Sequence, residues 1–410
     1  MRLLSLASMS KLKILLLESI HPVADGLLEA EGFEVHRADG ALKEDELVAR
    51  LKGIHLLGIR SKTQVTKRVL DAADSLIGLG AFCIGTNQIA LDHAMKRGVA
   101  VFNAPFSNTR SVAEMVIAEI VMLSRHLGDR SREMHRGVWK KVATGSREVR
   151  GKTLGVVGYG HIGSQVSILA EDLGMRVVFH DTSAKLPLGN SGPVKSLDAL
   201  LEQSDFVTLH VPETPQTRGM IGATQLARMK KGACLINASR GTVVDLEALA
   251  QAIKEKRLDG AAVDVYPEEP ESNSAEGFET PLRGLPNIIL TPHIGGSTLE
   301  AQEAIGREVS ASLARFAHTG TTVSSVNFPP VDLARTPDTW RLINVHQNVP
   351  GVMRDLNRLV SDRNANIHAQ VLSTNAAIGY LIMDLDSDVA AQVVEDMRRL
   401  PTSISARTVA

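Results

Sequence analysis

Arg240, Glu269 and His293 lie in three separate segments of the chain, and each comes shortly after an apolar run. A histidine exchanges protons near neutral pH, and a carboxylate partner orients its ring and raises its pKa. A guanidinium can bind a substrate carboxylate through two parallel hydrogen bonds. Together these side chains suit the removal and return of a hydroxyl proton on a small organic acid.

Each of the three residues also has an ordinary structural interpretation. A single histidine near a strand end is more often a surface or capping residue than an acid–base group. Glu269 follows Glu268 and could belong to a solvated turn, and Arg240 could pair with any acid. The set becomes informative because all three follow predicted strands, and the carboxyl ends of parallel strands line the ligand crevice of an open α/β sheet.

A glycine-rich turn provides a candidate cofactor site. Gly158, Gly160 and Gly163 follow the apolar run 154–157 and open a predicted helix. The first glycine permits a tight turn, the second lets the backbone approach a pyrophosphate, and the third lets the helix pack closely on the strand. Free N–H groups at the start of the helix can then bind phosphate. Alone the motif is weak, because in an arbitrary sequence a glycine turn without a ligand explains it better.

Asp181 strengthens this interpretation, because it ends the next apolar run, 176–180, near the position expected for a ribose-binding carboxylate. Its oxygens can accept hydrogen bonds from both ribose hydroxyls, whereas a 2′-phosphate would meet like charge. The sequence therefore favours NAD over NADP. The alternative is a solvated acid at a strand end.

The composition excludes several classes of protein. The chain has 410 residues, with 45 basic and 46 acidic side chains and 3% aromatic residues, which argues against nucleic-acid binding. Cys83 and Cys234 lie far apart without metal-ligand spacing, so we expect a reducing compartment and no metal. The apolar start, 1–8, is too short for a signal peptide before Lys11 and Lys13. We therefore expect a cytoplasmic protein that does not enter a membrane.

The order of predicted elements indicates three folding regions. Alternating strands and helices before the glycine turn predict a parallel α/β lobe, and four further strands after it complete a doubly wound domain. A helix over 299–318 and a linker over 331–339 precede a βαββαβ pattern, which fits a ferredoxin-like module. The expected strands are 13–17, 56–60, 76–80, 99–103, 154–157, 176–181, 206–210, 233–237, 260–264, 288–291, 341–346, 367–373, 379–385 and 404–409.

Several motifs, spread over nearly the whole chain, resemble the D-isomer-specific 2-hydroxyacid dehydrogenase family, whose arginine, glutamate and histidine occur in this order. Within that family the chain is most similar to short bacterial enzymes of serine synthesis that oxidise 3-phospho-D-glycerate. The motifs are Gly85-Thr86-Asn87-Gln88, 102–114, 135–139, 236–245 and 292–298.

The resemblance implies a fold and domain boundaries. The fold is α/β, with a Rossmann-type NAD domain (108–296) inserted into a flavodoxin-like substrate domain (1–107). The return part of the substrate domain and the linker take 297–336, and a ferredoxin-like ACT domain takes 337–410.

The resemblance also implies residue roles. Arg240 is the substrate anchor, Glu269 the partner of the histidine, and His293 the general acid and base. The implied NAD contacts are Gly158, Gly160, His161, Ile162, Gly163, Asp181, Ala238, Arg240, Asp264, His293, Gly295 and Gly296, and the implied substrate contacts are Arg60, Ser61, Asn108, Arg240 and, from a neighbouring subunit, Lys141.

The C-terminal module resembles an amino-acid-binding ACT domain, which in this family pairs across subunits and binds L-serine as a feedback inhibitor. His346, Asn348 and Asn366 stand at the positions of the serine ligands, and a homotetramer is implied. A purely structural dimerisation module is the alternative.

Two positions depart from the family. A Gly-Gly pair that precedes the module in relatives is replaced by 335–339, which contains Pro337, so we expect serine inhibition to be weaker or differently coupled. Asp39 replaces a lysine of relatives, although Arg37 lies close by as another cation.

The implied reaction is the NAD-dependent oxidation of 3-phospho-D-glycerate to 3-phosphohydroxypyruvate. Two alternatives stay open: a dehydrogenase for another small 2-hydroxy acid, such as 2-hydroxyglutarate, and a non-catalytic NAD-sensing regulator. The presence of both His293 and Glu269 argues against the sensor, which needs no acid–base pair.

Overall fold

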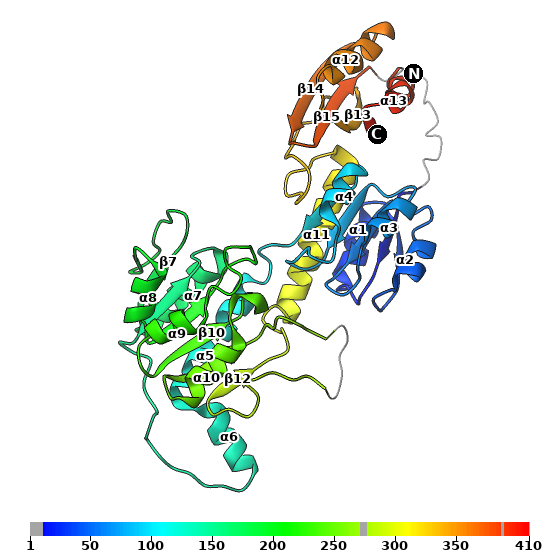
Figure 1. The fold of residues 1–410 in the computed structure, drawn as a ribbon. Coiled ribbons are helices and arrows are strands. Elements are labelled where there is room, and N and C mark those ends of the chain that lie inside the picture. Colours follow the sequence, from blue (N-terminus) through cyan, green and yellow to red (C-terminus); the bar gives the residue numbers. More distant parts are fainter. Residues whose placement is uncertain (1–10, 271–276, 387–388, 410) are drawn as a thin grey trace. The chain divides into compact units, whose positions relative to one another are not determined.

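The computed structural model describes residues 11–270, 277–386 and 389–409. The short apolar start discussed above lies outside this part of the chain. Tertiary contacts divide the chain into two compact units, one formed by the chain up to Ser107 together with the chain from Gln302 onward, the other by Asn108–Ala301. Figure 1 shows the second unit in cyan to yellow-green.

The N-terminal lobe of the first unit is a five-stranded parallel sheet in the order β2-β1-β3-β4-β5. This is the flavodoxin-like order that the sequence predicts. Helices pack on both faces, so β1, β3 and β4 are buried almost throughout. The elements are β1 (Lys13–Leu16), α1 (Val23–Ala30), β2 (Glu34–Arg37), α2 (Glu44–Arg50), β3 (Leu56–Ile59), α3 (Lys67–Ala72), β4 (Gly78–Ala81), α4 (Leu91–Lys96) and β5 (Ala100–Asn103).

The second unit is a seven-stranded parallel sheet in the order β12-β11-β10-β9-β6-β7-β8. The order reverses at β6, which pairs with both β7 and β9, so the glycine turn after β6 lies at the switch point of a Rossmann-type fold. The elements are α5 (Thr109–Arg125), α6 (Leu127–His135), β6 (Thr153–Val157), α7 (His161–Asp172), β7 (Arg176–His180), β8 (Gly192–Pro193), α8 (Leu197–Gln203), β9 (Phe206–Leu209), α9 (Ala223–Arg228), β10 (Ala233–Asn237), η1 (Gly241–Val243), α10 (Leu246–Lys254), β11 (Leu258–Val263) and β12 (Ile288–Leu290).

The C-terminal module of the first unit is a four-stranded antiparallel sheet in the order β14-β15-β13-β16, as a ferredoxin-like fold requires. One face of the sheet is covered by α12 and α13, and the other packs on the core of the N-terminal lobe. The return helix α11 (Leu299–Thr319) leads to this module, whose elements are β13 (Trp340–Gln347), α12 (Val352–Asp362), β14 (Ile367–Thr374), β15 (Ile378–Leu385), α13 (Ala390–Arg398) and β16 (Ser403–Val409).

The linker before β13 is fastened to both parts that it joins. The buried guanidinium of Arg341 bonds Asp384 at 2.7 and 2.9 Å, and it also donates to the carbonyls of Thr319, Leu333 and Ala334. A buried charge with such a full set of partners holds its surroundings in one arrangement. The end of α11, the linker and the module sheet therefore form one packed body.

Among the described residues, none of the helices combines the length and the apolar character that crossing a bilayer requires. Within the same residues, no three histidine, cysteine or acidic side chains gather as metal ligands would.

Candidate active site

His293 and Glu269 form an ion pair at the carboxyl ends of β12 and β11. The Nδ1 atom of His293 lies 2.7 Å from Oε2 of Glu269, and Oε1 of Glu269 accepts the backbone N–H of Tyr266 at 3.1 Å. The hydrogen bond to Glu269 raises the pKa of His293 above its usual value. Burial favours neutral Glu269, but hydrogen bonds from His293 and Tyr266 outweigh it and lower the pKa. Glu269 is thus an ionised carboxylate that favours the imidazolium form of His293.

Asp264 organises the turn that carries His293. Its buried carboxylate accepts hydrogen bonds from the Thr291 hydroxyl at 2.6 Å and from the N–H groups of Ile294 and Gly295 at 2.9 Å. Its carbonyl accepts the N–H of His293 at 2.8 Å. The resemblance implies that Asp264 contacts NAD; in the structure, its hydrogen bonds fold the turn that carries His293.

The Arg240 loop is fixed to the loop that carries Glu269. Asn237, at the end of β10, bonds the N–H and hydroxyl of Ser239 and donates to the carbonyl of Arg240. A Cβ atom on Gly241 would overlap the backbone of Tyr266, so the two loops touch there. The positive charge of Arg240 adds to the lowering of the pKa of Glu269 and partly opposes the rise in the pKa of His293. The structure thus brings Arg240, Glu269 and His293 close enough for their charges to interact.

The glycine turn after β6 has the geometry that a dinucleotide needs. Gly158 has φ +89°, and a Cβ there would overlap the carbonyl of His210; a Cβ on Gly163 would overlap the carbonyl of Gly158. The space beside Gly160 is open. Gly160 is the N-cap of α7, and as a glycine it has no side chain that could bond the first turn of the helix.

Asp181 lies directly after β7, and its carboxylate is held in place. One oxygen accepts the N–H of Tyr159 at 2.9 Å, within the glycine turn, and the other accepts the N–H and hydroxyl of Ser183. Burial favours the neutral acid, but these hydrogen bonds outweigh it and lower the pKa of Asp181. The residues around the turn therefore fit NAD, with a charged carboxylate beside the ribose position.

Asn108 and Gly296 approach each other within the second unit. A Cβ on Gly296 would lie 2.5 Å from Nδ2 of Asn108, so a larger residue there would displace the asparagine side chain. The Oδ1 atom of Asn108 is buried without a hydrogen-bond partner in the described part of the chain. An unsatisfied buried acceptor of this kind is available to a ligand.

Glu119 is a buried acid for which the sequence predicts no functional role. It lies in α5 with 3% of its surface exposed, and neither carboxylate oxygen has a hydrogen-bond partner among the described residues. Burial and the nearby charge of Asp264 raise the pKa of Glu119 to about 8. The signal that could have revealed it is an acid on the apolar face of a predicted helix.

Arg60 and Ser61 follow β3 in the other unit, at the carboxyl edge of the lobe sheet, with Arg60 half-buried and Ser61 exposed. Arg37 does not replace the missing lysine at position 39 as a substrate cation. Its guanidinium bonds both carboxylate oxygens of Asp25 at 2.5 Å and the carbonyl of Ile20 at 2.8 Å. Arg37 thus serves the packing of the lobe.

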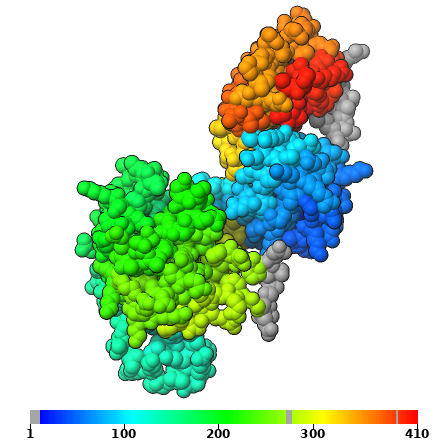
Figure 2. Space-filling view, in the orientation of Figure 1, coloured from blue at the N-terminus to red at the C-terminus, as the bar shows by residue number. Residues whose placement is uncertain are grey.

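Lys141 lies on an arm formed by α6 and the segment after it, which stands out from the second unit (Figure 2). The side chains of Met134, Val138 and Trp139 are exposed on this arm, Trp139 to 80%. They line a hollow together with Lys141. Exposed apolar side chains that cluster in this way are a feature of surfaces that contact proteins, membranes or ligands.

The three predicted serine ligands do not meet within one chain. His346 is opposite Gly379 in the sheet, whereas β14, which follows Asn366, begins opposite Leu385. These places on β15 are about 20 Å apart at the usual rise of a strand. His346 is buried, which lowers its pKa, and it bonds Asn344 at 2.9 Å, while Asn348 donates to the carbonyl of Asn375.

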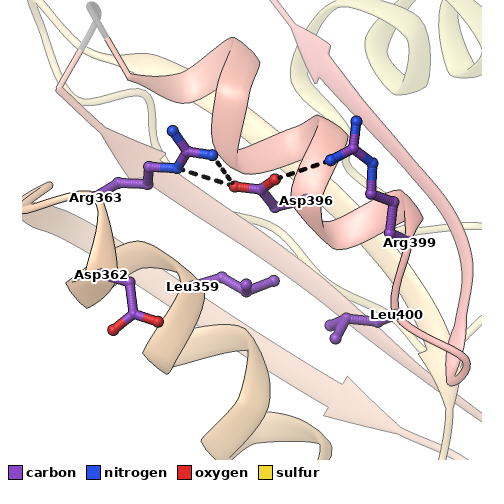
Figure 3. A pocket seen from close by; sticks show the side chains of 6 residues that line it. All are labelled: Leu359, Asp362, Arg363, Asp396, Arg399 and Leu400. Atoms are coloured by element: carbon purple, nitrogen blue, oxygen red, sulfur yellow. Dashed lines mark hydrogen bonds and ion pairs between the residues drawn. The ribbon is translucent and has the colours of Figure 1, made fainter.

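A separate groove lies between the ends of α12 and α13 (Figure 3). Asp396 pairs with both arginines of this groove. Its carboxylate accepts two N–H groups of Arg363 and lies 3.8 Å from Arg399. None of the predicted serine ligands lines this groove. Its lining residues are Leu359, Asp362, Arg363, Asp396, Arg399 and Leu400.

Comparison with known proteins agrees with this architecture. Residues 117–295 match the D-isomer specific 2-hydroxyacid dehydrogenase, NAD binding domain, and residues 342–405 match an AHAS small subunit-like ACT domain. In the solved structures, the chain is similar to a D-isomer specific 2-hydroxyacid dehydrogenase from Lactobacillus delbrueckii ssp. bulgaricus in its NAD complexed form. That likeness has a TM-score of 0.67 and 27% identity, covering 77% of this chain and 100% of the other.

Curated relatives extend the likeness over the whole chain. The D-3-phosphoglycerate dehydrogenase of Dictyostelium discoideum is 52% identical over 97% of both chains. The enzyme of the same name from Escherichia coli (strain K12) is 50% identical, again over 97% of both. The chain therefore belongs to the D-isomer-specific 2-hydroxyacid dehydrogenase family and, within it, to the group of the D-3-phosphoglycerate dehydrogenases.

Proposed function

We propose that the protein oxidises 3-phospho-D-glycerate to 3-phosphohydroxypyruvate with NAD, reversibly, as the first step of L-serine synthesis. The observation that carries the proposal is the His293–Glu269 pair, 2.7 Å between nitrogen and oxygen, in the same neighbourhood as Arg240. The relatives that share nearly the full length of the chain bear the name of this reaction.

His293 is the general base for the oxidation. Because Glu269 engages Nδ1, Nε2 is the ring nitrogen that takes the hydroxyl proton of the substrate. Bound NAD would supply the hydride acceptor for the carbon that bears this hydroxyl, so that loss of the proton and the hydride together would leave the carbonyl of the product. Arg240 binds the substrate carboxylate and polarises the forming carbonyl. In the reverse direction the imidazolium of His293 returns the proton.

The cofactor is held by the glycine turn and the strand ends around it. Open backbone at Gly160 and the N–H groups at the start of α7 receive the pyrophosphate, and Asp181 receives the ribose hydroxyls. The turns after β10, β11 and β12 line the nicotinamide end. The proposed contacts are Gly158, Gly160, His161, Ile162, Gly163, Asp181, Ala238, Arg240, Asp264, His293, Gly295 and Gly296.

The substrate phosphate is bound by Arg60, Ser61 and Asn108, with Lys141 supplied by a neighbouring subunit. The exposed Trp139 of the arm supports subunit contact close to Lys141. We propose a homotetramer, in which the substrate domain, the inserted NAD domain and the ACT domain have the boundaries 107/108, 296/297 and 336/337.

L-serine is the proposed inhibitor, bound by His346, Asn348 and Asn366 where two ACT domains pair. The separation of His346 and Asn366 along β15 supports a site shared by two copies, because one copy cannot surround a ligand as small as serine with all three side chains.

Cys83 and Cys234 are not joined in a disulfide, which supports a cytoplasmic location.

One assay tests the reaction. NADH consumption is followed with 3-phosphohydroxypyruvate, 2-oxoglutarate and glyoxylate, each with and without L-serine. We expect turnover of 3-phosphohydroxypyruvate that serine reduces. Turnover of 2-oxoglutarate alone would make the protein a 2-hydroxyglutarate dehydrogenase, and NADH binding without any turnover would make it a sensor.

A further inference from the structure

The loop that carries Arg60 and Ser61 is held by a buried acid from another strand end. Glu18, just after β1, is 7% exposed, and its carboxylate accepts the backbone N–H of Lys62 at 2.9 Å and of Thr63 at 2.7 Å. Hydrogen bonds to an ionised acceptor are about twice as strong as neutral ones. Glu18 therefore fixes the backbone directly after Arg60 and Ser61.

A second side chain holds the same loop from the opposite side. Gln88, which is 8% exposed, donates through Nε2 to the carbonyl of Arg60 at 2.7 Å. The backbone of Gln88 also accepts the N–H of Val65 at 2.8 Å. The loop between β3 and α3 is thus attached to the end of β1 by Glu18 and to the segment after β4 by Gln88.

The backbone around Glu18 is strained. Glu18 and Ser19 both have positive φ, +60° and +50°, a region that side chains other than glycine adopt at a cost of about 1 kcal/mol or more each. Such strain persists only where the surroundings hold it, and it gathers at binding sites. Here it accompanies the two hydrogen bonds between the Glu18 carboxylate and the amides of Lys62 and Thr63.

We propose that Glu18 is a positioning residue for the substrate phosphate, with Gln88 as its counterpart. Glu18 occupies the amides of Lys62 and Thr63 and leaves the Arg60 guanidinium and the Ser61 hydroxyl as the groups that meet the ligand. It touches no reacting atom; it sets the conformation of the loop. This inference rests on the proposed function, because it takes Arg60 and Ser61 as phosphate ligands.

Glu18→Gln is the first test, because glutamine has the same size as glutamate. Its single amide oxygen replaces only one of the two carboxylate oxygens that accept the N–H groups of Lys62 and Thr63. We expect the KM for 3-phosphohydroxypyruvate to rise about tenfold, with a change in kcat of less than about threefold. The KM for glyoxylate, which has no phosphate, and the affinity for NADH should not change. Asp74→Asn is the matched control, since Asp74 binds a backbone N–H, that of Gly53, at the opposite end of the same sheet.

Gln88→Met is the second variant, which removes the bond to the Arg60 carbonyl without removing a charge, and it should give the same selective rise in KM. Amide hydrogen exchange provides a readout that needs no turnover: the amides of Lys62 and Thr63 should exchange faster in Glu18→Gln than in the parent protein.

If 3-phosphohydroxypyruvate is not a substrate of the parent protein, the proposed function fails, whatever the exchange shows. If it is a substrate but both variants change the KM for glyoxylate and for 3-phosphohydroxypyruvate equally, or change neither, the positioning role is refuted.

Discussion

His293 occupies a backbone conformation that few residues other than glycine adopt, with φ of +54°. Its N–H is bonded to the carbonyl of Asp264, and the next two N–H groups are bonded to the Asp264 carboxylate. These bonds offset the local strain, which is the usual arrangement at a functional turn. Asp264 and His293 therefore act as one structural unit, in which the acid shapes the turn and the imidazole faces Glu269.

Glu269→Gln should move the pH profile of the reaction to lower pH. The hydrogen bond to the Glu269 carboxylate raises the pKa of His293, so imidazolium persists to higher pH in the parent protein than in the variant. Reduction of the oxo acid needs imidazolium, so its rate should fall at a lower pH in the variant. Oxidation needs the neutral ring, so its rate should begin to rise at a lower pH.

The measurement is kcat/KM in both directions over about pH 5 to 10. Glu268→Gln is the control, because Glu268 is the exposed neighbour and does not bond the ring. Unshifted midpoints in Glu269→Gln would show that Glu269 does not set the protonation of His293.

Glu119→Gln should stabilise the protein increasingly as the pH rises from 6 to 8. Burial raises the pKa of Glu119 from 4.5 to about 8, so within this window the folded protein keeps a proton that the unfolded chain releases. The free energy of unfolding then falls with pH, by up to roughly 1.4 kcal/mol per unit for one group. Glutamine has no proton to release and removes this loss.

Urea unfolding of the variant and its parent at pH 6 and at pH 8 measures the difference, which should grow by about 2 kcal/mol across the window. Glu114→Gln is the control on the same helix, where the carboxylate is exposed and paired with Arg110. A constant difference between the two pH values would show that Glu119 is already ionised in the folded state.

At the scale of elements, the contact between the loops after β10 and β11 decides the geometry of the site. Gly241 lies against the backbone of Tyr266, so Gly241→Ala has no flexible neighbour to displace. We expect a loss of about 1–3 kcal/mol in stability and a large loss of kcat/KM, because Arg240 and Glu269 move apart.

Gly128→Ala is the matched control, since a Cβ at Gly128 meets no atom within 4 Å and the residue lies in helix α6. It should leave turnover unchanged and unfold no more easily than the parent. Parental stability and turnover in Gly241→Ala would mean that the two loops separate without consequence.

The sequence predicts secondary-structure elements whose buried residues form a clear apolar run. It misses elements that lack such a run and form only through pairing with a neighbouring strand. The apolar runs before Gly158 and Asp181 identify β6 and β7, and the fold class is confirmed. The strand β2, which reads Glu-Val-His-Arg, has no such pattern, because it lies at the edge of its sheet and pairs only with β1.

The same limit applies within the candidate site. Strand ends indicate that Arg240, Glu269 and His293 should converge, because parallel strands share one carboxyl edge. The bonding of Asp264 to three donors and the grip of Glu18 on the loop after β3 depend on turn conformations that no residue pattern encodes. Sequence therefore indicates the reacting groups better than the groups that hold them.

At the scale of the whole molecule, the C-terminal module is seated on the lobe through buried polar contacts. Arg341 binds Asp384 and three carbonyls, and the hydroxyl of Tyr380 donates to the carbonyl of Gly320 at 2.6 Å. The linker with Pro337 thus joins two parts that already pack together. The linker is therefore part of a packed interface and not a free tether.

Arg341→Met should release the module. Removing one partner of a buried ion pair costs about 3–5 kcal/mol, and here three carbonyls also lose their donor. We expect faster proteolysis within 331–339 and loss of serine inhibition, while turnover without serine persists. Arg358→Met is the control, because Arg358 is exposed on α12. Full serine inhibition in Arg341→Met would show that the interface carries no regulation.

The inserted unit has its two ends side by side. Within it the hydroxyls of Ser111, near the start of α5, and Thr298, just before α11, lie 2.7 Å apart, and within the host unit Ser107 bonds Glu308. Adjacent ends are what the insertion of one domain into a loop of another requires. In genetic terms, the coding sequence for this stretch can be inserted at a single loop position of a host protein. The order of the strands in the host sheet then stays the same.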